Sequence, residues 1–148
     1  MGETVLNGDT IALLKECNAG CKSATNSMEQ ILEHVENPHL KDLMHETNEK
    51  HVQIGDECHQ LLNDAGEDEK DPQPVSAAFA WMGTEIKMMM KDDTHQAASL
   101  LIDGCSMGIK SLSEYMNKYP NADKKSVELC ERLKSSEKEF MEKLEAFL

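Results

Sequence analysis

The chain has 148 residues and a formal net charge of −13, and only 4% of its residues are aromatic. That length suits one domain with one hydrophobic core, which we place at residues 1–148. The negative charge argues against binding to nucleic acid or to an anionic membrane surface, and no apolar run approaches the roughly 20 residues that span a bilayer.

Leu, Met, Ala, Glu and Lys dominate the composition, which favours helix over sheet. A first amphipathic helix is expected over about 9–36, where apolar residues recur at spacings of three and four. Asn37 and Pro38 end it and begin the next, with Asn37 as N-cap and Pro38 in the first helical position. The second helix is expected over 38–65 and ends at Gly66. The short connection makes these two helices an antiparallel hairpin.

An acidic stretch with two prolines follows, and then a shorter helical segment over 75–91. Asp93 and Gln96 form a capping-box pattern that begins a third full helix over 94–119. Pro120 and Asn121 turn the chain, and the last helix is expected over 122–147, with its apolar residues in regular three-four alternation.

The connection between the two hairpins determines the topology. About nine extended residues and seventeen helical ones cover roughly 50 Å, whereas a full-length helix here is about 40 Å long. The connection can therefore cross the whole bundle and start the third full helix parallel to the second. We predict an all-α, ferritin-like four-helix bundle whose long crossover contains a short extra helix.

A hairpin, a crossover carrying Trp81-Met-Gly-Thr-Glu-Ile-Lys87, and then Gly104 and Tyr115 on the next helix make the chain resemble small bacterial ferritin-like bundles. These are distantly related to rubrerythrin and include a largely uncharacterised family of stand-alone four-helix proteins. The resemblance spans nearly the whole chain but rests on no single diagnostic motif. It therefore implies the fold more strongly than any function.

Di-iron members of that superfamily carry a Glu on the first helix, Glu-x-x-His on the second, Glu on the third and Glu-x-x-His on the fourth. Here Asn48-Glu-Lys-His51 keeps the His but has an amide in place of the bridging carboxylate. Cys105 stands where the third-helix Glu is expected, and Phe140 follows Glu137 where the fourth-helix His would be. Iron prefers several carboxylate ligands, so a ferroxidase or di-iron oxidase is not expected. His51, Cys105 and Glu137 form a candidate degenerate site, in which we expect His51 to hydrogen-bond Glu137.

All five cysteines fall on inward faces of the expected helices and, without an export signal, are expected to be reduced thiols in a cytoplasmic protein. Cys17 and Cys21 lie one turn apart on one helix face, and Cys58 and Cys130 fall near the same level. Four converging thiolates would suit Zn(II) or Cu(I). Buried cysteines also serve simply as small apolar residues, and the sequence alone favours that packing role.

No glycine-rich phosphate loop, nucleophile elbow or His-Glu-x-x-His motif points to an enzyme. We therefore expect a non-enzymatic helical module without a cofactor that acts through protein contacts. A homodimer is expected, with Trp81 and the methionines around it as the contact patch. The alternative from another functional class is a bundle that binds or stores a soft metal, Zn or Cu(I), through its inward cysteines.

Overall fold

The computed structural model describes residues 5–67, 85–89 and 93–148. Within these ranges every regular element is helical, which confirms the all-α prediction. The elements are, in chain order, α1 (Gly8–Leu32), α2 (Pro38–Asp64), α4 (Thr94–Lys118), α5 (Lys124–Leu144) and the 3₁₀ turn η1 (Glu145–Phe147). None of the described helices combines the length and apolarity that crossing a lipid bilayer requires.

The helix boundaries follow the predicted capping residues. The Asn37 side chain accepts hydrogen bonds from the first backbone N–H groups of α2, and Pro38 stands in the first turn. The Asp93 side chain accepts from the backbone N–H of Gln96 and caps α4. Gly66 has a φ of 72° directly after α2, a backbone conformation that a side chain would disfavour.

The first helix is shorter than expected, because α1 ends at Leu32 rather than at residue 36. Beyond Leu32 the backbone N–H groups of His34 and Val35 bond three residues back, at 2.9 and 3.2 Å, as in a tightened turn. Val35 remains buried although it is no longer helical. Because Val35 continues the apolar periodicity of α1, the sequence pattern predicted helix up to residue 36.

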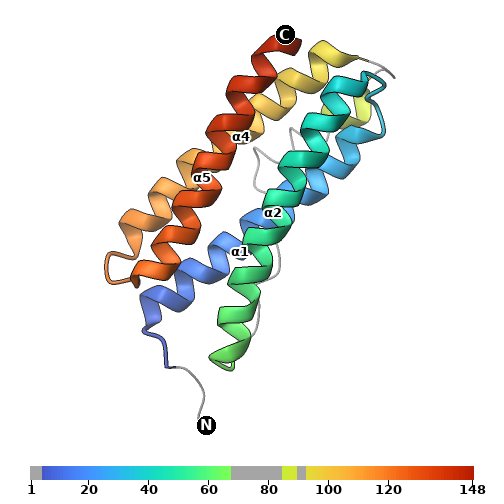
Figure 1. Cartoon of the computed structure of the whole chain (residues 1–148). Coiled ribbons are helices and arrows are strands. Elements are labelled where there is room, and N and C mark those ends of the chain that lie inside the picture. The colour runs from blue at the N-terminus through green and yellow to red at the C-terminus, as the bar shows by residue number, and fades with distance from the viewer. Residues whose placement is uncertain (1–4, 68–84, 90–92) are drawn as a thin grey trace.

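The helices form two antiparallel hairpins, α1–α2 and α4–α5, that pack against each other (Figure 1). In Figure 1, α2 and α4 run in the same direction, which confirms the predicted connectivity. Of the expected crossover helix over 75–91, the structure describes residues 85–89, and 85–88 are helical. The remainder, including Trp81, lies outside the described residues.

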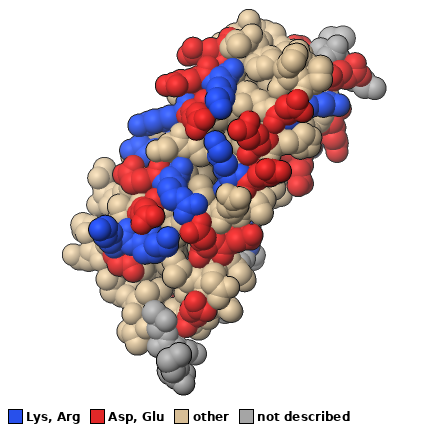
Figure 2. All heavy atoms as spheres, in the orientation of Figure 1, with Lys and Arg blue, Asp and Glu red and all other residues tan. Residues whose placement is uncertain are grey.

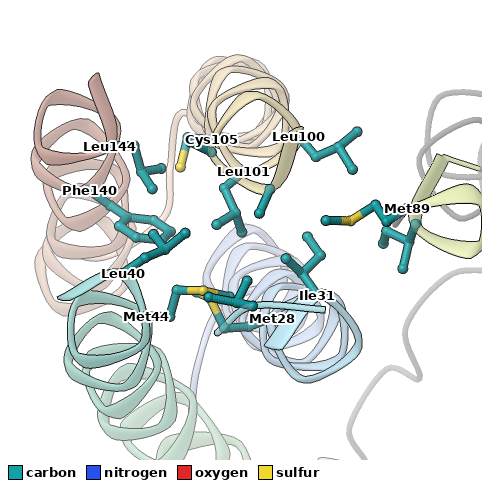
Figure 3. Close-up of a cluster of buried hydrophobic side chains, with 14 residues drawn as sticks. Met28, Ile31, Leu40, Met44, Met89, Leu100, Leu101, Cys105, Phe140 and Leu144 are labelled. Carbon is teal, nitrogen blue, oxygen red and sulfur yellow. The ribbon is translucent and has the colours of Figure 1, made fainter. Parts of the chain in front are cut away.

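The hydrophobic core consists of two clusters at opposite ends of the bundle. We call the first the Phe140 core; it joins the end of α1, the starts of α2 and α4, and the end of α5 (Figure 3). Met89 reaches it from the crossover and lies beside Ile31 and Leu100 (Figure 3). The second, which we call the Leu129 core, joins the start of α1, the ends of α2 and α4, and the start of α5. The first turns of α2 and α4 both belong to the Phe140 core. Since the two helices begin at the same end of the bundle, they run parallel.

The start of α1 is tied to the loop between α4 and α5. The Asn7 side chain donates to the backbone carbonyl of Asn121 at 2.9 Å, and the backbone N–H of Asn121 donates to Asp9 at 2.9 Å. The backbone N–H of Asp123 donates to the hydroxyl of Thr10 at 2.8 Å, while the Asp123 side chain caps α5. These bonds close this end of the bundle without a covalent link.

Charges of both signs are mixed over the face that carries α2 and α5 (Figure 2). Glu57 on α2 bonds Arg132 on α5 at 2.6 Å and lies 3.5 Å from Lys125. Further along the same seam Lys50 lies 3.4 Å from Glu139. On this face the Glu57 and Glu139 carboxylates are therefore paired with basic side chains.

Candidate functional site

The structure brings together the four cysteines that the sequence placed near one level. Cys17 and Cys21 come from α1, Cys58 from α2 and Cys130 from α5, and all four are buried free thiols in the Leu129 core. The side chains of Cys130, Cys21 and Cys58 all lie close enough to the Cys17 thiol to raise its pKa. Cys17 is thus the centre of a group of four thiols, which we call the four-thiol cluster.

A glycine lets α1 and α2 approach closely beside this cluster. A Cβ atom added to Gly55 of α2 would lie 3.3 Å from the Cβ of Cys21 and 4.0 Å from its sulfur. Sequence reasoning missed Gly55. A lone glycine inside a helix costs about 1 kcal/mol of stability relative to alanine. Its presence there therefore suggests a packing reason, such as a neighbouring helix that approaches closely.

The Cys17 thiol is held in its protonated form. Hydrogen bonds with Cys130, Cys21 and Cys58, followed by burial and the charge of Cys58, raise the pKa of Cys17 well above its usual range. A buried protonated thiol is a poor nucleophile, which argues against cysteine catalysis here. Among the described residues, no three His, Cys, Asp or Glu side chains are already arranged around a point that could hold a metal ion. Metal binding would therefore require the thiols to lose protons and to rotate.

The second predicted group also comes together, nearer the middle of the bundle. Nε2 of His51 on α2 lies 2.5 Å from Oε1 of Glu137 on α5, as expected for this pair. Both residues are buried, with 1% and 7% of their surface exposed. Cys105 on α4 points its sulfur toward α5 (Figure 3) and lies close enough to the Glu137 carboxylate to feel its charge. Burial and then the Glu137 carboxylate raise the pKa of the Cys105 thiol far above its usual range.

This group has one polar atom left without a protein partner. Nδ1 of His51 is buried and makes no hydrogen bond among the described atoms, and the same holds for Oδ1 of Asn48 one turn earlier on α2. A histidine that donates one ring N–H to a carboxylate presents the other nitrogen as an acceptor or metal ligand. With an amide at Asn48 and a thiol at Cys105, however, the group offers a single carboxylate. That donor set does not fit a di-iron centre.

Gly108 lies opposite Glu137, a position that the sequence pattern did not predict. A Cβ added to Gly108 on α4 would lie 3.8 Å from Oε2 of Glu137, which is ordinary van der Waals contact. The Glu137 side chain therefore extends across the interior from α5 to α4, touching helices α2 and α4 at once.

The family model described as a domain of unknown function, DUF2383, matches residues 9–118. The chain belongs to the DUF2383 family. The match includes α1, α2 and α4, with Cys17, Cys21, His51, Cys58 and Cys105, and ends before α5. Two residues of the candidate sites, Cys130 and Glu137, therefore lie beyond the segment that defines DUF2383 here.

Among solved structures, the DUF2383 chain is similar to a crystal structure of a DUF305 fragment from Deinococcus radiodurans. The two align with a TM-score of 0.74 over 97% of each chain, at 12% sequence identity. At that identity the likeness shows the all-helical fold alone. No curated protein is significantly similar to the chain. Neither match carries a ferritin or rubrerythrin name, so that part of the resemblance stays a prediction.

Proposed function

We propose that this protein is a non-enzymatic helical bundle that binds a soft metal ion through Cys17, Cys21, Cys58 and Cys130. One observation carries the proposal: four buried free thiols from three helices belong to the same core cluster, and Cys130, Cys21 and Cys58 all lie close enough to Cys17 to perturb its thiol. In a core otherwise made of leucines and isoleucines, four thiols in one place form a soft-donor set. Simple packing would not require them to meet.

Cu(I) suits this cluster better than Zn(II). A Zn(II) site needs four thiolates in a tetrahedron at ~2.3 Å, with every pair of sulfurs at a similar separation. In this cluster three thiols act together on a single one, that of Cys17. Cu(I) accepts two or three sulfur ligands and binds soft thiolates strongly, so it can enter with smaller side-chain movements. No carboxylate belongs to the cluster, and iron as a di-iron centre is not proposed.

Binding at this cluster releases protons. The raised pKa of Cys17 means that a metal must displace a proton that the folded protein holds firmly. Metal affinity should therefore increase with pH between 6 and 8, and each thiolate formed should appear as a released proton. Storage or buffering of the metal fits this burial better than catalysis, because Cys17 and Cys58 have no exposed surface at all.

The alternative of action through protein contacts has less support from the described residues. The expected contact patch at Trp81 lies outside them, and the large apolar side chains that are exposed, Val5, Val52, Met88 and Leu148, belong to different parts of the chain. The homodimer remains a prediction. Light scattering on a size-exclusion column tests it directly, and a monomer at high concentration would count against it.

The proposal is tested by metal uptake under anaerobic, reducing conditions. The full chain is titrated with Cu(I) against a coloured Cu(I) chelator, and separately with Zn(II), followed by elemental analysis. We expect stoichiometric Cu(I) retention that Cys17→Ala abolishes. Cys105→Ala is the matched control, because Cys105 is equally buried but lies outside the four-thiol cluster. Failure of the wild-type chain to compete for either metal, or equal uptake by Cys17→Ala, would overturn the proposal.

A further inference from the structure

A cavity of about 170 Å³ lies between α1 and α4. Part of its wall is formed by small residues about one helical turn apart, which are Gly20, Ala24 and Ser27 on α1 and Gly104, Gly108 and Ser111 on α4. The size is close to that of an engineered cavity of ~150 Å³ that stays dry and binds benzene. The space would accept a molecule with a single ring.

One of the residues that line this cavity has a buried polar atom without a partner among the described residues. His51 lines the cavity, is 1% exposed, and has its Nδ1 unbonded among the described residues. Buried polar atoms are nearly always hydrogen-bonded, so a lone buried nitrogen beside a cavity points to an occupant that completes it. The small walls and this nitrogen are independent observations.

The partner of His51 determines what that occupant can be. In the tautomer whose Nε2 donates to Glu137, Nδ1 of His51 presents its lone pair as an acceptor. A ligand must therefore donate a hydrogen bond at this point. The carboxylates of Glu16 and Glu137 line the cavity and none of the described lining residues is Lys or Arg, so an anion is repelled. A cation would lose its hydration against mostly apolar walls, which leaves a neutral donor.

We propose that this cavity binds a small neutral phenol or alcohol, whose hydroxyl donates to Nδ1 of His51 while its apolar body lies between α1 and α4. This function is separate from metal binding at the four-thiol cluster and does not depend on it. The structure thus assigns His51 a ligand-binding role, with Glu137 as the residue that fixes its tautomer.

The test is isothermal titration of the full chain with phenol, benzene and benzoate, in EDTA so that no metal contributes. We expect phenol to bind about 2- to 10-fold more tightly than benzene, the gain of one hydrogen bond, and benzoate not to bind. Phenol should also shift the ring ¹⁵N resonance of His51 Nδ1. Absence of phenol binding, or equal binding of benzoate, would overturn the proposal and would leave the cavity to water.

Two variants locate the binding. Gly20→Leu fills the cavity from its rim; an added Cβ there meets only Leu133 Cδ2, at 3.9 Å, so the helix tolerates it. It should abolish binding of phenol and benzene, whereas Asn26→Leu, at an exposed position of the same helix, should not. The double variant His51→Leu, Glu137→Leu removes both polar partners together and should keep benzene binding while losing the preference for phenol. Phenol binding that survives Gly20→Leu would place the site elsewhere.

Discussion

Gly55 on α2 lies so close to Cys21 on α1 that a Cβ added to the glycine would come within 3.3 Å of the Cβ of Cys21. That separation is shorter than ordinary van der Waals contact, and both atoms are fixed to helical backbone. The absence of a side chain at Gly55 therefore sets how closely the two helices of the first hairpin can approach next to the four-thiol cluster.

Gly55→Ala should show this constraint. Alanine gains about 1 kcal/mol of helix propensity over glycine, but here the methyl group must push α1 away from α2. Gly20→Ala is the matched control, because its added Cβ meets nothing closer than 3.9 Å. We expect Gly20→Ala to raise the free energy of unfolding in urea and Gly55→Ala to leave it unchanged or lower it. Equal gains in both variants would contradict the close contact.

Removing one member of the His51–Glu137 pair should lower the free energy of unfolding far more than replacing both members by apolar residues. His51→Leu leaves the buried Glu137 carboxyl without its partner and should lower the free energy of unfolding by about 3 kcal/mol. Replacing both residues by Leu should recover most of that loss. Lys50→Ala, at an exposed ion pair between the same two helices, should cost less than about 1 kcal/mol. Urea denaturation measures all three, and a double variant as unstable as the single one would be the contrary result.

The raised pKa of Cys17 predicts a loss of stability at alkaline pH. The unfolded chain releases this proton near the ordinary thiol value of 9.0, whereas the folded protein keeps it to higher pH. The protonated Cys17 thiol therefore makes its full contribution to the free energy of unfolding below pH ~9. That contribution falls as the pH rises further, by up to about 1.4 kcal/mol per pH unit. Urea denaturation of reduced protein between pH 8 and 10.5 should show a steeper decline for the wild type than for Cys17→Ala. Parallel declines would refute it.

The Glu57 ion pairs predict a small effect at the acidic end. Partial burial opposes ionisation of Glu57, but the hydrogen bond and charge of Arg132, with the charge of Lys125, outweigh it and lower the pKa. Stability from this group is present above the unfolded value of about 4.5 and is lost as the pH falls through the lower folded value. Glu57→Gln should cost less than about 1 kcal/mol at pH 7, and the difference should vanish at pH 2 to 3. A penalty that persists at pH 2 would exclude the ionic explanation.

The hydroxyl of Thr10 should contribute to closing the loop end of the bundle. Thr10 is 1% exposed and accepts from the backbone N–H of Asp123. Thr10→Val keeps the shape but leaves that N–H without its acceptor, at a cost of about 1–2 kcal/mol. Thr10→Ser restores the hydroxyl and should recover part of the loss. Hydrogen exchange at the Asp123 amide provides a local measurement, and unchanged protection in Thr10→Val would contradict this role.

The fold was predictable because its signals are local. Asn37, Pro38 and Asp93 mark helix ends through hydrogen bonds and backbone preferences that act within one turn. The crossover is also long enough to allow α2 and α4 to run parallel, as they do in Figure 1. The early end of α1 was not predictable, since Val35 stays buried after the helix stops and so continues the apolar pattern.

For the candidate sites, the sequence predicted only which residues lie at the same height along the bundle axis. Spacing placed Cys17, Cys21, Cys58 and Cys130 together, and likewise His51, Cys105 and Glu137. That Cys17 would lie at the centre of the thiols, or that Nδ1 of His51 would be left without a partner, depends on helix rotation and side-chain rotamers. Residue spacing determines neither helix rotation nor side-chain rotamers. The cavity between α1 and α4 likewise depends on how far apart two helices stand.

The polar pair at mid-bundle also restricts how the helices can align. His51 and Glu137 lie between the Phe140 core and the Leu129 core, both of which consist mainly of apolar side chains. If α5 slid along α2 by one heptad, most of the apolar side chains would still meet apolar side chains, but the Glu137 carboxylate would be buried away from its imidazole. A misaligned bundle would therefore carry two uncompensated buried groups, much as a single buried Asn fixes the register of a coiled coil. The pair selects one register from several that hydrophobic packing alone would allow.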